Sequence, residues 1–425
     1  FIGMTEKLLH FIWQFQYFNK TNLITQEGEE LVILNQGALN TNQGPDFLLA
    51  SVKMNNITFV GNIELHINAS DWYKHKHSND ENYNNVILHV VWNYDKPLVV
   101  KNKIIPTLEL KTLVAKVLLQ RYQSLMEFTT KIPCQTFLPA LTTIGWMSWK
   151  ERLAAERLEN KSKEILQLFQ ESKQHWEETF WWLLAANFGI KINQQVFKEI
   201  AQSIPVQVLA KHKNQMQQLE ALLFGQANFL NEKPTDEYTT LLQKEFQFLQ
   251  HKYKLKKVNA KVLFLRMRPA SFPTIRLAQL AMLIHNSSHL FSKIKELKTV
   301  EEVKLLFDIT ANDYWHYHYK LGEKTDYAPK HLGSQMVDNI LINTIVPVLF
   351  AYGWYNKEES YKTKAIQWLQ QISAEKNTII KYWQTAEIAI QSAFDTQALL
   401  HLDKNYCKQL KCLECAVGNK ILKTV

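Results

Sequence analysis

The tightest constraint on the fold is a pair of strand-like segments, residues 47–54 and 57–67, which are separated only by Asn55-Asn56. Two strands joined by two residues pair as an antiparallel hairpin, and asparagine tolerates the backbone of such a turn. The second segment alternates apolar and polar side chains, which is the period of a strand with two different faces. This alternation places Glu64 and His66 on the same polar face.

Asp46 directly precedes the first strand, in the loop sequence Gly44-Pro45-Asp46. With a two-residue turn, Asp46 would lie opposite Leu65 and diagonal to Glu64 and His66. One additional loop residue or a bulge would place it directly opposite one of them. Carboxylates commonly hold Mg²⁺ together with water and phosphate oxygens, and an imidazole can serve as a base, a ligand or a phosphate contact. The alternative is a polar sheet edge with ordinary charges.

These residues resemble the PD-(D/E)XK nuclease superfamily. In that superfamily an acidic residue opens one strand of a hairpin, Glu-x-Lys lies on the next strand, and a helix and a further strand follow. Asp46 matches the first acid and Glu64 the second. Residues 71–84 correspond to the helix, and residues 85–92, which contain Val-Ile-Leu-His-Val-Val, correspond to the buried strand. The resemblance covers roughly residues 30–115.

The resemblance implies a metal-dependent nuclease that acts on DNA or RNA. Asp46 and Glu64 would bind Mg²⁺ or Mn²⁺, and the cation would stabilise charge on the leaving oxygen. The sequence departs from the superfamily where His66 replaces the lysine. His66 would then orient or deprotonate the attacking water. The same departure supports a second interpretation, a non-catalytic nucleic-acid or ribonucleoprotein-binding protein on a degenerate nuclease fold.

The chain as a whole also resembles one uncharacterised bacterial family, catalogued as domain of unknown function 2851. That family brings no activity with it. The segments that carry the resemblance are Gly44-Pro45-Asp46-Phe47, Glu64-Leu65-His66, residues 70–77, residues 268–276 and the cysteine-rich C-terminal residues.

Length and composition favour several compact domains and a mostly helical structure outside the N-terminal part. The chain has 425 residues with only 12 Gly and 11 Pro, and a hydrophobic content of 46% supports sizeable cores. The net charge of +9 permits nucleic-acid binding, although a solvated lysine-rich surface explains it equally well. No apolar run approaches the ~20 residues of a membrane span, and no signal peptide is recognisable. We therefore expect a cytoplasmic protein without a membrane partner.

The predicted fold class is α+β, in three parts. Residues 1–135 form a nuclease-like domain with a small mixed sheet, and a first helix is expected over residues 4–22. Residues 136–400 form a large all-α domain, in which residues 149–169 have the pattern of one long amphipathic helix. Residues 401–425 form a cysteine-rich tail that packs on the rest.

Several histidines lie close to the two carboxylates in the sequence. In an extended segment His75 and His77 would point to one side, whereas in a helix they would diverge. Together with His66 they could bind a transition metal, since imidazole suits such ions. Alternatively Lys74, His75 and His77 form a phosphate-contacting surface, or a solvated polar stretch. His89 lies within an apolar strand and has the pattern of a core histidine.

The cysteines form a second potential metal site. Cys407, Cys412 and Cys415 have the spacing C-x4-C-x2-C, and Cys134 is the only other cysteine. Structural disulfides are rare in the cytosol, so a CxxC-containing cluster is more typical of metal binding. Four thiols can complete a tetrahedral Zn site or hold a 4Fe-4S cluster. Some PD-(D/E)XK nucleases carry a cluster on one remote and three nearby cysteines, with other spacings. The alternative is a set of reduced, unliganded thiols.

Three arginines flank the segment Pro269-Ala270-Ser271-Phe272-Pro273 in the sequence: Arg266, Arg268 and Arg276. On a rigid proline loop they would offer forked donors to the phosphates of a nucleic acid. The alternative is a helix N-terminus near Thr274 with the arginines paired to carboxylates.

The sequence contains no Walker-type phosphate loop, no G-x-G-x-x-G and no G-x-S-x-G. Their absence argues against an ATPase, a Rossmann oxidoreductase and an α/β-hydrolase. Metal-dependent phosphodiester cleavage is therefore the leading prediction, with the non-catalytic binder second. A third interpretation is a hydrolase of a small substrate that uses a histidine-bound metal.

Overall fold

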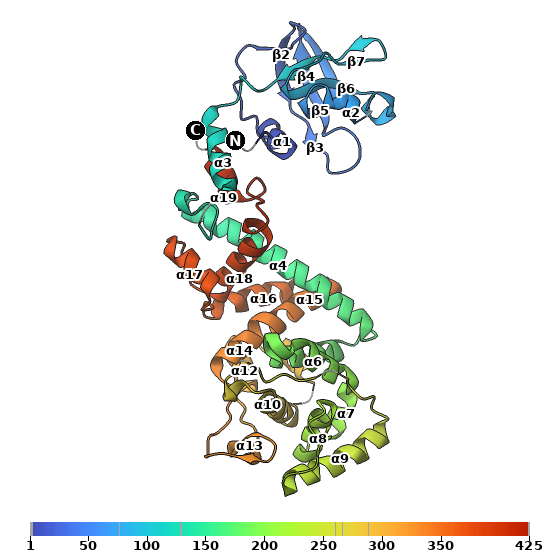
Figure 1. Ribbon diagram of the computed structural model, residues 1–425, viewed down its shortest axis with the longest axis vertical. Coiled ribbons are helices and arrows are strands. Elements are labelled where there is room, and N and C mark those ends of the chain that lie inside the picture. The colour runs from blue at the N-terminus through green and yellow to red at the C-terminus, as the bar shows by residue number, and fades with distance from the viewer. Residues whose placement is uncertain are drawn as a thin grey trace. The chain divides into compact units, whose positions relative to one another are not determined.

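The computed structural model describes residues 3–75, 77–127, 130–259, 261–265, 267–287 and 289–423. The chain divides into two compact units. The sheet unit comprises Phe1–Trp149, Lys381–Ile388 and Leu402–Val425, and the helical unit comprises Lys150–Ile380 and Ala389–His401. The C-terminal segment therefore belongs to the same unit as the N-terminal sheet. The fold contains both strands and helices, with the strands concentrated in the N-terminal part and helices elsewhere (Figure 1).

A seven-stranded mixed sheet forms the centre of the sheet unit, in the order β1-β2-β4-β5-β6-β9 with β3 paired to β4. The first four strands in this order are antiparallel, whereas β5, β6 and β9 run parallel. Parallel neighbours require a crossover between β5 and β6, and two histidines of the candidate site, His75 and His77, lie on it. The strands are β1 (Leu23–Ile24), β2 (Glu30–Asn35), β3 (Ala38–Leu39), β4 (Phe47–Met54), β5 (Ile57–Asn68), β6 (Val86–Asn93) and β9 (Thr107–Glu109).

The expected two-residue hairpin between β4 and β5 is confirmed. Asn55 and Asn56 have φ values of 43° and 71°, as a type I′ turn requires. Met54 pairs with Ile57, and the same register continues to the pair of Ala50 and Gly61. Beyond that pair the register shifts, so that Phe47 faces Ile63.

The shift is a β-bulge, in which two residues of β4 face one residue of β5. Leu49 lies in the bulge with φ 56°, and its side chain is exposed. The bulge displaces the remaining part of β4 by one residue, so the position before Phe47 faces Glu64 rather than Leu65. Of the two predicted registers, the structure therefore has the one with a bulge.

The crossover between β5 and β6 is not the single helix that residues 71–84 predicted. It consists of the short helix α2 (Asp71–Lys74) and two 3₁₀ turns, η1 (His77–Asn79) and η2 (Glu81–Tyr83). Polar residues of this stretch satisfy the backbone locally: the carboxylate of Asp80 accepts a hydrogen bond from the N–H of Asn82 at 2.9 Å. Such bonds compete with a continuous helix. Trp72 is fully buried and holds the crossover on the sheet.

Two further features place β6 and the N-terminal helix against β5. A Cβ atom on Gly61 would lie 2.4 Å from Ile87 Cγ2 and 2.6 Å from the carbonyl oxygen of Asn85, so this approach requires glycine. Helix α1 (Glu6–Gln14) packs on β5 through its buried apolar face. Its N-cap is Thr5, which accepts the N–H of Leu8 at 3.2 Å. The helix ends at Gln14 and does not continue to residue 22 as predicted.

The remaining elements of the sheet unit lie outside the main sheet. They are β7 (Val99–Val100), β8 (Lys103–Ile104), α3 (Lys116–Met126), η3 (Gln135–Phe137), η6 (Asp403–Cys407) and α19 (Ala416–Lys423). Helix α19 packs on α3, and the guanidinium of Arg121 donates to the carbonyl of Ile421 at 3.3 Å.

In the described part of the helical unit, the secondary structure consists of helices and one short two-stranded hairpin (Figure 1). Residues 149–169 do lie in one long helix, as predicted, because α4 runs from Thr143 to Glu171. Of the described residues, one helical run, Ser334–Asn356, is long and apolar enough to cross a membrane, but 78% of it is buried, as in a core helix.

The helices of this unit, including those that continue into the sheet unit, are α4 (Thr143–Glu171), α5 (Trp176–Phe188), α6 (Ile190–Ser203), α7 (Val206–Lys211), α8 (Met216–Gln226), α9 (Glu237–Tyr253), η4 (Pro269–Ser271), α10 (Pro273–Asn286), α11 (Leu290–Glu296), α12 (Val300–Leu306), α13 (Asp313–His316), α14 (Ser334–Ile340), η5 (Leu341–Ile345), α15 (Val346–Asn356), α16 (Glu359–Gln371), α17 (Thr378–Thr385) and α18 (Ala393–Leu402). A two-stranded hairpin, β10 (His318–Lys320) and β11 (Glu323–Lys324), accompanies them.

Candidate metal centre

The two predicted carboxylates lie side by side at the end of the β4–β5 hairpin. The backbone N–H of Asp46 donates to Glu64 Oε2 at 3.0 Å, and the N–H of Leu65 donates to Asp46 Oδ2 at 2.9 Å. These reciprocal bonds follow from the bulge, which brings Asp46 opposite Glu64. His10 of α1 also approaches, with Nε2 3.2 Å from Asp46 Oδ2.

Three histidines converge beside these carboxylates. His66 Nε2 lies 3.1 Å from His75 Nδ1, and one nitrogen of each of His66, His75 and His77 lies within 4.8 Å of the other two. His66 comes from β5, His75 follows α2 and His77 begins η1. His75 and His77 lie neither in one strand nor in one continuous helix, and their ring centroids are 5.4 Å apart.

Glu64 completes a set of four potential ligands. Its Oε1 lies 3.7 Å from His66 Nε2 and 3.4 Å from His77 Nε2. The Nε2 atom of His77 is buried and makes no hydrogen bond within the part of the chain that the structure describes. A buried polar nitrogen without a partner is costly, and a bound ion is one way to satisfy it.

A second layer of side chains fixes the orientation of the imidazoles. His66 Nδ1 lies 2.9 Å from Nε2 of His89, which is fully buried. If the Nδ1 atom of His66 carries the proton and donates it to His89, Nε2 of His66 is left free as a ligand. The ring of His77 stacks on Tyr83 at 4.0 Å, and Trp72 packs against His66, His77 and His89. His89 is therefore a core histidine, as the sequence indicated, and its hydrogen-bond partner is His66.

Burial controls the protonation of the centre. Desolvation, followed by the charge of Asp46, raises the pKa of Glu64 to about 9. Desolvation, followed by the neighbouring histidines, lowers the pKa of His66 to about 3, and burial also lowers the pKa of His77. The imidazoles of His66 and His77 are consequently neutral near pH 7, which is the form that binds metal ions.

The donor set fits a transition metal better than magnesium. Three imidazole nitrogens and a carboxylate oxygen suit Zn²⁺ or Fe²⁺, whereas Mg²⁺ prefers oxygen ligands. In a tetrahedral zinc site the nitrogens are about 3.3 Å apart, because each lies 2.0–2.1 Å from the metal. The 3.1 Å between His66 and His75 is close to that spacing. His75 is exposed, so the centre is open to solvent on that side.

The other residues predicted to contact nucleic acid lie elsewhere. Lys74 forms an ion pair with Asp71 at 2.5 Å instead of joining the histidines. Arg268 and Arg276 belong to the helical unit, and Arg266 lies outside the described residues. Arg268 is exposed, whereas Arg276 is buried and donates to Gln279 Oε1 at 2.9 Å. Among the described residues, Arg276 forms no ion pair with a carboxylate, so the predicted alternative of paired arginines is wrong for this position.

All four cysteines are buried, carry free thiols and lie in the sheet unit. Sequence reasoning did not find His10 or Tyr83 as neighbours of the centre. Neither lies in a motif with the carboxylates, and only the packing of α1 on β5 brings His10 to Asp46.

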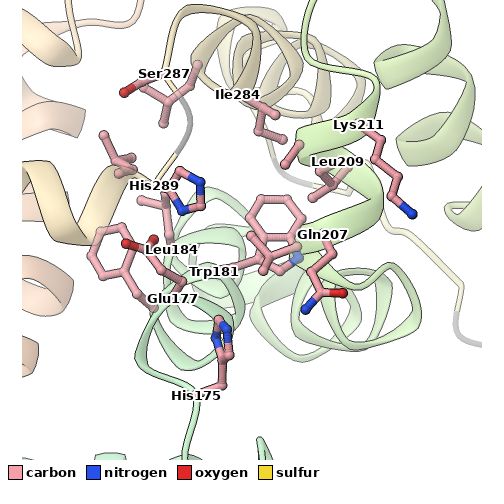
Figure 2. Close-up of a pocket in the computed structure, with 15 residues that line it drawn as sticks. His175, Glu177, Trp181, Leu184, Gln207, Leu209, Lys211, Ile284, Ser287 and His289 are labelled. Atoms are coloured by element: carbon pink, nitrogen blue, oxygen red, sulfur yellow. The ribbon is translucent and has the colours of Figure 1, made fainter.

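The helical unit contains an apolar pocket of about 470 Å³ (Figure 2). Trp181 and Leu209 lie near its middle and Lys211 at its edge. The carboxylate of Glu177 is already engaged, because it accepts the N–H groups of Phe291 and Ser292 at the start of α11. Glu177 is the one acid among the described residues that line the pocket, so the histidine cluster is the better candidate for catalysis. The lining side chains come from α5, α7, α10, α11 and the residues next to them.

Comparison with known proteins gives a family and no activity. No curated protein and no solved structure matches the chain. One family profile, described as protein of unknown function (DUF2851), matches residues 6–378, which include both the carboxylates and all the clustered histidines. The match covers most of the sequence, and the chain belongs to this family.

Proposed function

We propose that this chain is a metal-dependent hydrolase that cleaves phosphodiester bonds in DNA or RNA. Glu64, His66, His75 and His77 would hold one divalent transition metal ion, Zn²⁺, Fe²⁺ or Mn²⁺. The observation that carries the proposal is the cluster of three imidazole nitrogens within 4.8 Å of one another, with Glu64 Oε1 facing two of them.

The chain's own residues have separable tasks in this proposal. His89 orients His66, and Tyr83 supports the ring of His77. A bound divalent metal would lower the pKa of a water ligand to about 7, which supplies a nucleophile near neutral pH. Asp46 lies against Glu64 and is partly exposed, so its carboxylate is placed to accept a proton or a hydrogen bond from that water.

Two observations favour a phosphodiester as the substrate. The order of the parts, a first acid at a hairpin, a second acid on the next strand and a parallel strand after a crossover, is the order that the PD-(D/E)XK resemblance implies. The net charge of +9 suits a polyanionic partner. Binding of such a partner would weaken with increasing salt.

The test combines metal content with cleavage. Wild type, Glu64→Gln and His77→Ala would be analysed for bound metal and assayed on labelled single- and double-stranded DNA and RNA with added Zn²⁺, Mn²⁺ or Mg²⁺. His251→Ala, which changes an exposed histidine of the helical unit, serves as the matched control. We expect both site variants to lose cleavage and to bind metal at least about 100-fold more weakly, because direct ligands matter more than second-layer groups.

Each other outcome selects a different function. Full cleavage by His77→Ala would refute the proposed centre. Salt-dependent nucleic-acid binding by wild type without turnover would indicate the non-catalytic binder. Metal bound by the histidines without any affinity for nucleic acid would indicate a hydrolase of a small substrate.

A further inference from the structure

The apolar pocket of the helical unit has the size and the lining of a small-molecule binding site (Figure 2). Its volume of about 470 Å³ lies within the ~300–1,000 Å³ that is usual for such sites. Side chains from α5, α7, α10 and α11 form its walls, among them Trp181, Leu184, Leu209 and Leu283. Each of these four is at most 4% exposed, so the walls belong to the packed core of the unit. The pocket therefore suits the hydrophobic part of a ligand.

Two polar side chains of the pocket already have partners within the protein. The indole Nε1 of Trp181 donates to the carbonyl of Ala201 at 3.1 Å, so Trp181 presents only its apolar ring to a ligand. Both carboxylate oxygens of Glu177 accept backbone N–H groups, from Ser292 at 2.7 Å and from Phe291 at 3.2 Å. The charge of Glu177 is thus satisfied at the start of α11 rather than by a ligand.

The other polar side chains that line the pocket keep hydrogen-bond donors. His175 Nδ1 accepts a backbone N–H of α5 at 3.1 Å, which leaves the ring proton on Nε2. Ser287 Oγ accepts a lysine ammonium of α11 at 3.0 Å, which leaves its O–H to donate. Lys211 is the one lysine or arginine among the described lining residues. Gln207 and His289 can each donate as well as accept. The pocket therefore offers a ligand more donors than acceptors.

The position of Lys211 determines where a charged group of the ligand would lie. Lys211 is the last residue of α7 and lies at the edge of the pocket, whereas Leu209 lies near its middle (Figure 2). Its alkyl stem can follow the apolar wall while the exposed ammonium group stays in water. A single lysine at the mouth of an apolar interior is complementary to an apolar molecule with one negative charge. A carboxylate supplies that charge together with acceptor oxygens for the surrounding donors.

From this arrangement we infer that the pocket binds a medium-chain fatty acid, with the alkyl chain inside and the carboxylate beside Lys211. Among the described lining residues, six are leucine, isoleucine or valine and two are aromatic, so the walls match an alkyl chain better than a flat ring. One of the two aromatic rings, that of Phe180, is already stacked on Phe291 at 5.4 Å. The site belongs to the helical unit and does not rest on the reaction proposed for the histidine centre.

The experiment is isothermal titration calorimetry of the full chain with decanoate, and with decan-1-ol and decylamine as molecules of equal length with other head groups. We expect saturable binding of one decanoate per chain and weaker binding of the other two. Lys211→Met keeps an apolar stem and removes the charge, so it should weaken decanoate binding about tenfold and leave decan-1-ol binding unchanged. Ala210→Phe, at an exposed lining position, should abolish the binding of both. Lys244→Met, which removes an exposed lysine of α9, is the matched control and should bind like wild type.

Other results would overturn the inference in different ways. Decan-1-ol or decylamine that binds as tightly as decanoate would refute the carboxylate assignment. Decanoate binding that neither variant weakens, or no saturable binding at all, would refute the site. Dimers of wild type that dissociate in Ala210→Phe would show that a second copy of the chain covers the pocket instead. Circular dichroism checks the fold of Ala210→Phe, and the exposed Lys211→Met tests the site without it. Metal content and cleavage at the histidine centre are measured separately, so the two proposals fail separately.

Discussion

Glu220 offers a sharp test of how burial acts on this protein. It is fully buried in α8, and three donors surround its carboxylate. Asn312 Nδ2 and Trp315 Nε1 donate to Oε1 at 2.6 and 3.0 Å, and the hydroxyl of Tyr238 contacts Oε2 at 2.5 Å. Desolvation nevertheless outweighs these bonds and raises the pKa of Glu220 from 4.5 to about 7.

The sign and size of the effect on stability follow from this shift. Below pH 4.5 both the folded and the unfolded chain carry the proton, so Glu220 adds no pH dependence. Between pH 4.5 and 7 the unfolded chain loses the proton first, and the free energy of unfolding falls as pH rises. The loss reaches about 3 kcal/mol above pH 7, because a tenfold change in proton affinity is worth about 1.4 kcal/mol.

Glu220→Gln should remove this dependence. Glutamine can keep the bonds from Asn312 and Trp315 on its oxygen, and its amide can donate to Tyr238, whose hydroxyl then accepts. We therefore expect wild type and variant to unfold at similar temperatures near pH 5. Near pH 8 the variant should be more stable, by roughly 6–12 °C if about 3 kcal/mol is recovered.

Thermal unfolding followed by circular dichroism from pH 5 to 8.5 measures the difference. Glu159→Gln, an exposed carboxylate on α4 in the same unit, is the control and should parallel wild type. Parallel pH profiles of wild type and Glu220→Gln would refute the reasoning, and so would a wild type that is the more stable protein at pH 8.

Two further predictions concern positions where the structure requires or favours glycine. Gly225→Ala should lower the unfolding temperature, because a Cβ atom would lie 2.1 Å from the ring of Phe246. Overpacking of this kind costs about 1–3 kcal/mol. The control is Gly333→Ala, where a Cβ atom meets nothing within 4 Å, and it should leave the unfolding temperature nearly unchanged. Asn56→Gly should stabilise the chain by roughly 0.5 kcal/mol in denaturant unfolding, since Asn56 has φ 71° in the hairpin turn. Asn55→Gly should not, because the Asn55 side chain accepts the N–H of Glu30 at 3.2 Å.

The hairpin was predictable because its determinants are local. Alternation over residues 57–67 and the pair Asn55-Asn56 together specify the strands, the turn and the face that Glu64 and His66 share. The position of the bulge was not predictable. It depends on Leu49 adopting a positive φ, which neither its side chain nor its neighbours in sequence indicate. Asp46 could therefore be placed near Glu64, but its direct partner could not be chosen.

The histidines show a different limit. His75 and His77 were recognised as possible ligands, but their convergence depends on the break between α2 and η1, because in a continuous helix over residues 71–84 their side chains would diverge. His10 depends on the docking of α1 on β5, a contact between segments more than 40 residues apart. Long-range packing of this kind leaves no periodic signal in the sequence.

Charge balance explains why the proposed metal site does not require the lysine that the PD-(D/E)XK resemblance would place at the position of His66. A lysine at this position would offset the charge of Glu64, whereas burial and the neighbouring imidazoles lower the pKa of His66 to about 3 and keep it neutral. In the described part of the chain, Asp46 and Glu64 form ion pairs only with histidines. Two adjacent carboxylates without a fixed cation are relieved either by a proton or by a divalent ion. Imidazole ligands favour a transition metal over magnesium, so in the proposed site His66 would alter which ion is preferred.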